Sequence, residues 1–123
     1  MYVLDTQITL EKVRCFAYHG VNPQEKKIGN HFHVTLTVKG DFKAAMDKDD
    51  LTLTVSYADL LETIQEQMAI PSELLEHVSG RIHRAIYERF PPIEQIELAI
   101  TKCNPPMGGD LDGATVTTRS ERD

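Results

Sequence analysis

Residues 31–42 read HFHVTLTVKGDF, and their side chains alternate between apolar and polar. Phe32, Val34, Leu36 and Val38 fall on one face of an extended chain. The other face carries histidine, threonine and lysine side chains. A period of two predicts a β-strand with one buried face, and a threonine-rich opposite face is typical of a half-exposed sheet surface.

Three more segments of the chain alternate in the same way. The apolar side chains of residues 7–18 switch parity midway, which predicts a β-bulge near Lys12. Residues 93–103 alternate clearly and residues 113–119 more weakly. We therefore expect four strands, two in the first third of the chain and two in the last.

Two amphipathic helices are predicted between the pairs of strands. Ser56 and Asp59 form a capping-box pattern ahead of apolar residues at helical spacing, and this helix is expected to end near Ile70. Ser72 is the expected N-cap of a second helix, whose apolar stripe continues to Phe90.

The predicted order of elements is β-β-α-α-β-β. This order favours an α+β fold in which a four-stranded antiparallel sheet carries both helices on one face. The 123 residues are expected to form a single domain, 1–123. Such a sheet leaves two edges unpaired, and closing several sheets edge to edge into a barrel would pair them. We therefore expect a homo-oligomer.

Composition and charge exclude several classes of protein. The chain has 13 Lys and Arg against 19 Asp and Glu, a net charge of −6. This acidic balance argues against a nucleic-acid partner or an anionic membrane surface. No stretch has the roughly 18 consecutive apolar residues of a membrane span, and no signal-peptide pattern opens the sequence. Cys15 and Cys103 are expected to be free thiols in a cytoplasmic protein.

Lys102 and Glu76 are candidates for chemistry, each with an ordinary structural alternative. Lys102 shares the parity of the inward side chains of its strand, so its ammonium is expected to be partly desolvated and suited to proton transfer. It can equally extend to solvent from the strand end. Glu76 lies early in the second helix, where the helix dipole stabilises a carboxylate. The same carboxylate can accept two parallel N–H donors from a heterocycle.

Tyr57 and Glu25 are weaker candidates when the residues are considered alone. Tyr57 opens the first helix, where its ring covers the helix entrance or offers a phenol to a ligand. Glu25 lies in a polar segment between the first two strands, which is expected to be an ordinary solvated loop.

A metal site is a further hypothesis. His31 and His33 would project from the same face of a strand, and His19 is a conceivable third ligand. A His-x-His pair on a polar strand face is more often plain surface, so we expect no metal. The chain has no local signature of Ser/His/Asp or Cys/His catalysis, of a phosphate-binding glycine loop or of a dinucleotide site.

Several short motifs follow one another along the chain in a specific order. They are Tyr18-His19-Gly20-Val21, Glu25 with Gly29, Thr54-Val55-Ser56-Tyr57, Leu74-Leu75-Glu76-His77 and Lys102-x-Asn104-Pro105-Pro106. Any one of them is weak, but the ordered set extends from Ile8 to Arg119 and is specific. On these residues the sequence resembles the dihydroneopterin aldolases of folate biosynthesis.

The resemblance implies a fold, an assembly and an activity. The fold would be the tunnelling fold, in which two tetrameric rings of sheet stack into a homo-octamer with active sites between neighbouring subunits. The substrate would be a small pterin, 7,8-dihydroneopterin, cleaved to 6-hydroxymethyl-7,8-dihydropterin and glycolaldehyde. The reaction of this family uses no cofactor, no metal and no Schiff base.

The resemblance also implies roles for the candidate residues. Glu76 would bind the amino-pyrimidine edge of the pterin through paired hydrogen bonds, assisted by the backbone of Leu75. Lys102 would move the proton of the side-chain hydroxyl, together with a bound water. Tyr57 of the adjacent subunit would lie near the ring and help to protonate the intermediate. Glu25 would hold the side-chain hydroxyls and the water.

Two other functions remain open at this point. One is a related epimerase that acts at the 2′ carbon of dihydroneopterin or its triphosphate. A triphosphate site needs extra cations, and Lys26 and Lys27 are the only basic residues near the motifs, so the unphosphorylated substrate is favoured. The other is a pterin-binding oligomer without activity, for which Lys102 would have no purpose.

Overall fold

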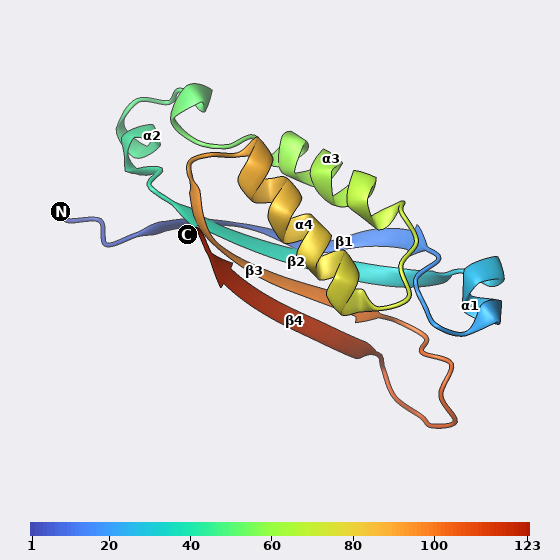
Figure 1. Ribbon diagram of the computed structural model, residues 1–123. Helices are drawn as coiled ribbons and strands as arrows, with labels where there is room; N and C mark the ends of the chain where they lie inside the picture. Colours follow the sequence, from blue (N-terminus) through green and yellow to red (C-terminus); the bar gives the residue numbers. More distant parts are fainter.

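The computed structural model describes residues 1–123 and contains four strands with two long helices between them (Figure 1). The elements in chain order are β1 (Thr6–Ala17), α1 (Pro23–Ile28), β2 (Asn30–Gly40), α2 (Lys43–Asp47), the 3₁₀ turn η1 (Leu51–Leu53), α3 (Tyr57–Met68), α4 (Leu75–Arg89), β3 (Ile93–Lys102) and β4 (Ala114–Glu121).

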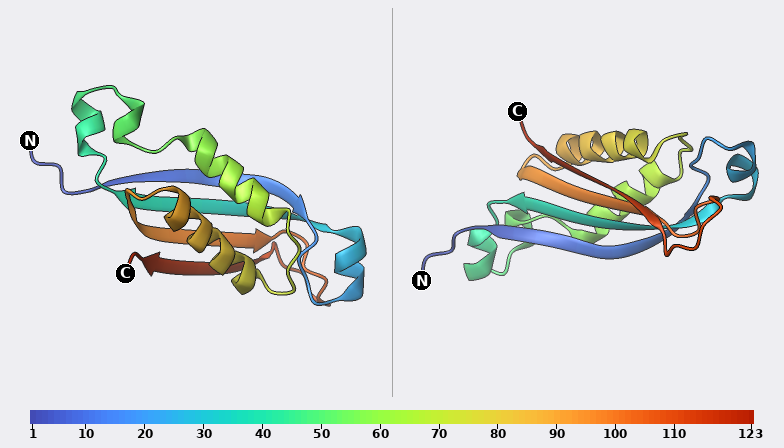
Figure 2. Two further views of the ribbon diagram at one scale, coloured as in Figure 1. Left: turned by 45° about the horizontal axis from the view of Figure 1, so that its top comes forward. Right: turned by 90° about the horizontal axis from the view of Figure 1, so that it is seen from below.

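The four strands form one antiparallel sheet in the order β1-β2-β3-β4. Figure 2 shows α3 and α4 side by side on one face of this sheet, while the other face is open. The predicted α+β architecture is therefore confirmed. Strands β1 and β4 are the edges, and β4 has no fully buried residue.

The predicted bulge in β1 is also confirmed. Pairing with β2 runs regularly from Thr6 to Leu10 and resumes at Val13 with a shifted register. Lys12 lies between, with φ of +48°, and its N–H donates to Thr35 Oγ1 at 3.1 Å. The extra residue explains why the apolar parity of this strand changes along the sequence.

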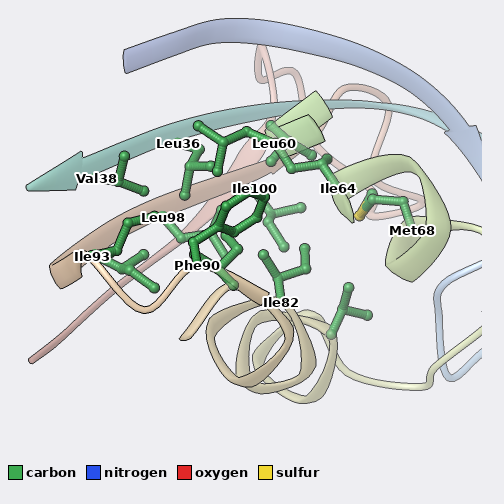
Figure 3. Close-up of a cluster of buried hydrophobic side chains, with 14 of the residues drawn as sticks. Leu36, Val38, Leu60, Ile64, Met68, Ile82, Phe90, Ile93, Leu98 and Ile100 are labelled. Atoms are coloured by element: carbon green, nitrogen blue, oxygen red, sulfur yellow. The ribbon is translucent and has the colours of Figure 1, made fainter. Parts of the chain in front are cut away.

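The hydrophobic core fills the space between the helices and the sheet (Figure 3). Leu60, Ile64 and Met68 point inward from α3 at helical spacing. They meet the inward strand residues Val34, Leu36, Val38, Ile96, Leu98 and Ile100 and the α4 residues Val78, Ile82 and Ile86. Burying each such aliphatic side chain stabilises the fold by roughly 1.5–3 kcal/mol. The core thus fixes the positions of β3 and α4, and the candidate residues lie at the end of β3 and at the start of α4.

Of the two predicted N-caps, Ser56 is confirmed and Ser72 is wrong. Ser56 is the N-cap of α3, and its Oγ accepts a hydrogen bond from the Asp59 N–H at 3.4 Å. Ser72 is not the cap of α4: the N-cap is Leu74, whose side chain makes no capping bond. The polar groups of Ser72 are engaged elsewhere, since its Oγ accepts a hydrogen bond from Arg81 at 2.9 Å.

Three short helical segments were not predicted. The most important is α1, which replaces the solvated loop expected around Glu25. Asn22 caps α1 by accepting the Gln24 N–H, and the Glu25 carboxylate accepts the Asn22 N–H at 3.3 Å. Pro23 stands at the first helical position, where its missing N–H costs nothing. The short helices α2 and η1 lie at the opposite end of the sheet from α1 (Figure 1).

None of the helices combines the length and the apolar character needed to span a bilayer.

Candidate active site

Lys102 and Glu25 form a largely buried ion pair at one end of the sheet. Lys102 is the last residue of β3, and its Nζ donates to Glu25 Oε2. The side chains of Lys102 and Glu25 are only 14% and 12% exposed, respectively. Lys102 therefore points inward, as its strand parity predicted, and does not extend to solvent. Glu25, by contrast, is no solvated surface charge but the partner of the lysine.

Gly20 makes room for this ion pair. The residue lies in the turn after β1, and a Cβ placed on it would overlap the carboxylate of Glu25. Any other residue at this position would therefore displace Glu25 from Lys102 or move the turn. The Phe32 ring packs on the other side, with its centroid 5.9 Å from Lys102 Nζ.

The ion pair faces a cleft of about 610 Å³. Five parts of the chain form its walls: the α1 region, the start of α4, the end of β3, the β3–β4 loop and the start of β4. Its lining includes Glu25, Glu73, Leu74, Leu75, Glu76, Lys102 and Met107. Leu74 and Met107 are more than half exposed, so apolar side chains face the solvent inside this cleft. A flat heterocycle would cover them.

Glu76 is placed to bind a ligand in this cleft. It belongs to the first turn of α4, is exposed, and pairs with no cation of the chain. The first N–H groups of a helix have no partner within the helix, so those of Leu75 and Glu76 are available to a ligand. The structure thus brings Glu76, Leu75, Glu25 and Lys102 together, four of the five predicted site residues.

Sequence reasoning missed the rim of the cleft. Glu73 lies at the edge, and its Oε1 is 3.1 Å from the Nζ of Lys26 on α1. Met107 of the β3–β4 loop is the second unpredicted lining residue. The only sequence signal for Glu73 was its position next to the Leu74–His77 motif. Nothing in the sequence pattern indicated Met107.

Tyr57 does not reach this cleft within its own chain. It is the first residue of α3, is 64% exposed and is absent from the lining. The 12 residues of α3 span about 18 Å. Figure 1 shows the start of α3 at the end of the helix layer that lies away from α1 and the β3–β4 loop. A role for Tyr57 in a site with Lys102 therefore requires a second subunit.

The histidines do not form the hypothetical metal site. His31 packs its ring against the edge of Phe16, with 5.1 Å between centroids. His19 is 1% exposed, and its Nδ1 accepts the N–H of Ser72 at 3.1 Å, which uses the lone pair that a metal would need. No group of three or more His, Cys, Asp or Glu side chains is arranged so that it could hold a metal ion. The expectation of a metal-free reaction stays a prediction.

Two buried histidines have depressed pKa values. Burial, with Arg81 nearby, lowers the pKa of His19 to about 4. Burial, with Arg84 nearby, also lowers the pKa of His83. His83 lies between α4 and β4, and its Nδ1 and Nε2 are 2.6 and 2.7 Å from the hydroxyl oxygens of Ser120 and Thr118.

These pKa shifts predict a loss of stability in mild acid. Because the folded-state pKa of His19 is lower than that of the unfolded chain, the unfolded chain binds more protons between the two values. The free energy of unfolding should therefore fall as the pH drops from about 6.5 toward about 4. Urea unfolding of the wild type and of His19→Asn at several pH values measures this contribution, since the carboxylates are common to both. Equal pH slopes for the two proteins would contradict it.

Comparison with known proteins identifies the family. A family model described as dihydroneopterin aldolase matches residues 8–119. The chain belongs to this family. A dihydroneopterin aldolase of Streptococcus pyogenes is 34% identical over 119 residues, which cover 94% of this chain and 98% of the relative. A dihydroneopterin aldolase of Staphylococcus epidermidis is 34% identical over 117 residues, which cover 94% of this chain and 97% of the relative.

Solved structures agree on the fold. The FolB protein of Vibrio cholerae superposes with a TM-score of 0.88 at 21% identity, covering 98% of this chain and all of the other. The Escherichia coli dihydroneopterin aldolase, crystallised with neopterin, superposes with a TM-score of 0.85 at 19% identity. The match covers 94% of this chain and 98% of the other. A Bacillus uricase gives 0.71 at 14% identity, covering 96% of this chain but 46% of the other. The subunit fold of the tunnelling-fold proteins, which the resemblance implied, is thereby confirmed, and the assembly into rings stays a prediction.

Proposed function

We propose that this protein is an aldolase that cleaves 7,8-dihydroneopterin into 6-hydroxymethyl-7,8-dihydropterin and glycolaldehyde. One observation carries the proposal: the largely buried Lys102–Glu25 pair and the unpaired Glu76 carboxylate face the same cleft. Family membership supplies the substrate class, because the relatives named above are dihydroneopterin aldolases.

The start of α4 is suited to hold the pterin ring. An amino-pyrimidine edge presents two parallel N–H donors, and the Glu76 carboxylate can accept both. The free N–H groups at the start of α4 add donors for the acceptors of the ring. Leu74 and Met107 provide apolar surface for its faces. This half of the cleft binds and orients the substrate.

The reaction needs few protein groups because the ring itself accepts electrons. Removal of the proton from the 2′-hydroxyl lets the bond between C1′ and C2′ break. The two carbons beyond that bond leave as glycolaldehyde, and the bond electrons pass into the ring C=N beside the side chain. A proton added at C1′ then gives the hydroxymethyl product. The net change is one proton moved from oxygen to carbon, so no oxidant or reductant is needed.

Lys102 and Glu25 are placed to move these protons. Within the pair the ammonium can pass one proton to the Glu25 carboxylate, and the resulting amine accepts the 2′-hydroxyl proton through a bound water. Proton transfer by a positioned side chain accelerates a reaction by roughly 10²–10⁴-fold. Glu25 fixes the position of Lys102 and can accept hydrogen bonds from the side-chain hydroxyls of the substrate and from a water. Tyr57 of a neighbouring subunit supplies the phenol that protonates C1′.

Mixed oligomers test whether Tyr57 and Lys102 of one site come from different chains. Tyr57→Phe and Lys102→Ala are each expected to be nearly inactive alone. Co-expressed with different tags and purified as mixed assemblies, they should regain activity, because random mixing makes about a quarter of the sites intact. Turnover per site of the mixed assembly is the measurement.

A matched pair provides the control for this experiment. Lys102→Ala and Glu25→Gln alter two residues that pair within one chain, so mixing them should restore nothing. Recovery in the control pair, or none in the Tyr57 pair, would contradict the shared site.

The charges on the cleft rim favour an unphosphorylated substrate. Lys26, a cation that would attract a triphosphate, is paired with Glu73. The carboxylates of Glu25, Glu73 and Glu76 also line the cleft, against the single cation Lys102. A polyphosphate side chain would be repelled, and this argues against the triphosphate epimerase.

An assay with both substrates tests the proposed function. The protein is incubated with 7,8-dihydroneopterin or its triphosphate in EDTA, and the products are separated by chromatography. Glycolaldehyde and the hydroxymethyl product, formed from the unphosphorylated pterin, are expected. A 2′-epimer formed mainly from the triphosphate would indicate the epimerase, and no product from either would leave a pterin-binding protein.

The proposal includes a homo-octamer of two tetrameric rings located in the cytoplasm. The open edges β1 and β4, together with exposed apolar side chains such as Tyr57 and Leu51, support assembly with further copies. The two unpaired thiols, Cys15 and Cys103, suit a reducing compartment. Native mass spectrometry tests the assembly, and the mass of a monomer would contradict it.

A further inference from the structure

His19 is a buried ionisable side chain that the proposed mechanism does not use. It lies in the turn after β1, is 1% exposed and does not line the cleft. Its Nδ1 accepts a hydrogen bond from the backbone N–H of Ser72 at 3.1 Å. The two residues are 53 positions apart in the chain, so this bond joins distant segments.

The hydrogen bond fixes the form of the imidazole. Because Nδ1 accepts, the proton of the neutral ring must be on Nε2. Nε2 is buried and has no hydrogen-bond partner in the structure. A doubly protonated ring would turn a second N–H toward that of Ser72, so the bond requires neutral histidine.

Two further contacts hold the same short segment between α3 and α4. The Gly20 N–H donates to the Ser72 carbonyl at 3.0 Å, so consecutive residues of the turn bind both sides of the Ser72 backbone. From α4, Arg81 donates to the Ile70 carbonyl and to Ser72 Oγ, both at 2.9 Å. The segment from Ile70 to Ser72 is thus held from two directions, and it leads within four residues to Glu76.

The same turn also touches the other half of the cleft. Gly20 packs against the Glu25 carboxylate without room for a side chain. The His19 ring contacts the ring of Phe32 edge to face, with 5.4 Å between centroids. That Phe32 ring lies beneath the ammonium of Lys102. His19 and Gly20 therefore connect the Lys102–Glu25 pair with the segment that carries Leu75 and Glu76.

We propose that His19 is a positioning residue that sets the pterin-binding start of α4 relative to the Lys102–Glu25 pair, through its hydrogen bond to Ser72. The inference rests on the proposed function, because it assumes that Glu76 binds the pterin. His19 acts through Ser72 and touches no substrate. Without the bond, the linker before α4 loses one of its anchors, and Glu76 moves relative to the proton-transfer pair.

Two substitutions of His19 with similar size test whether the hydrogen bond to Ser72 matters, because one keeps the acceptor at Nδ1 and the other removes it. In His19→Asn, the amide oxygen occupies nearly the place of Nδ1 and can accept the Ser72 N–H. In His19→Gln, the amide group lies nearer the place of Nε2 and leaves that N–H without a partner. The dissociation constant of 6-hydroxymethyl-7,8-dihydropterin and the KM for 7,8-dihydroneopterin are expected to rise about tenfold in the Gln variant. The Asn variant should stay within about threefold of the wild type.

His83→Gln provides a matched control for a loss of stability. His83 is the second buried histidine; both of its nitrogens are hydrogen bonded, and it lies outside the cleft. This variant should lower the midpoint of urea unfolding and leave the dissociation constant unchanged. All affinities are measured well below the unfolding transition, with assembly checked by native mass spectrometry.

Arg81→Met tests the same segment without changing His19. It removes the two hydrogen bonds from α4 and should also weaken pterin binding. Unchanged affinity in both His19→Gln and Arg81→Met would overturn the inference, as would an equal loss in the Asn and Gln variants or in His83→Gln. If His19→Gln does not fold, the comparison of Arg81→Met with His19→Asn tests the inference. Weaker pterin binding in Arg81→Met with nearly unchanged binding in His19→Asn would support it, and unchanged binding in Arg81→Met would overturn it. Failure of the wild type to bind pterin would instead contradict the proposed function.

Discussion

Replacing Lys102 with alanine is expected to remove most of the turnover while pterin still binds. In the proposed mechanism Lys102 moves the protons, whereas the ring is held by Glu76 and the start of α4, which also line the cleft. The kcat should therefore fall by about 10²-fold or more. The dissociation constant of the hydroxymethyl product should change little. Steady-state kinetics and a fluorescence titration with that product measure the two quantities separately.

The variant also leaves the largely buried Glu25 carboxylate without its cation. Removal of one partner from a buried ion pair is strongly destabilising, so the folded fraction must be measured at the assay temperature. The double variant Lys102→Ala/Glu25→Gln removes both charges and should recover stability without recovering turnover. A stability effect and a catalytic effect are then distinguished.

Lys26→Ala is the matched control for the loss of a lysine at this cleft. Lys26 lies on α1 next to Glu25, is about half exposed and pairs with Glu73 on the rim. An exposed pair of this kind contributes little to stability, and the residue has no place in the proton transfer. Its kcat should equal that of the wild type. An unchanged kcat in Lys102→Ala would remove Lys102 from the mechanism.

The inward direction of Lys102 shows what the sequence could predict. Strand parity depends only on the local chain, and a continuous alternation from Ile96 to Ile100 places residue 102 on the same side. The bulge at Lys12 was predictable for the same reason, since a change of parity needs an extra residue. Local periodicity thus predicted the strands, the long helices and one catalytic candidate.

The partner of Lys102 could not be predicted from local pattern. Glu25 is 77 residues away, and its burial depends on how α1 lies across the end of β3. The helix itself left a signal that was not used: Asn22, Pro23 and Glu25 occupy the cap, first and third positions of a capping box. Only the resemblance to the family pointed to Glu25 as a site residue.

Ser72 shows how tertiary contacts override a local rule. A serine ahead of an apolar helical stripe is a strong N-cap signal, yet the cap here is Leu74. The Ser72 hydroxyl and both of its backbone polar groups are bound to Arg81, His19 and Gly20. Three distant hydrogen bonds outweigh the single bond of a cap, and the helix begins later.

Replacing Glu76 with alanine is expected to abolish measurable pterin binding. The carboxylate is the group of the cleft that can accept the paired N–H donors of the ring while pairing with no cation of the protein. A hydrogen bond to a charged group contributes roughly 1.5–3 kcal/mol, so even one lost bond weakens binding by about 10- to 100-fold. Calorimetric titration with the hydroxymethyl product measures the loss.

Glu73→Ala is the matched control, because Glu73 is also an exposed carboxylate on the cleft, three positions earlier in the chain. Its Oε1 is bound to Lys26, so Glu73 cannot offer both oxygens to a pair of donors without breaking that ion pair. The affinity of Glu73→Ala for an uncharged pterin should match the wild type within about twofold. Glu76→Gln keeps the size of the side chain and one acceptor oxygen, so its affinity should fall between those of Glu76→Ala and the wild type. If Glu76→Ala retains full affinity, the pterin binds elsewhere, and the start of α4 is not its recognition element.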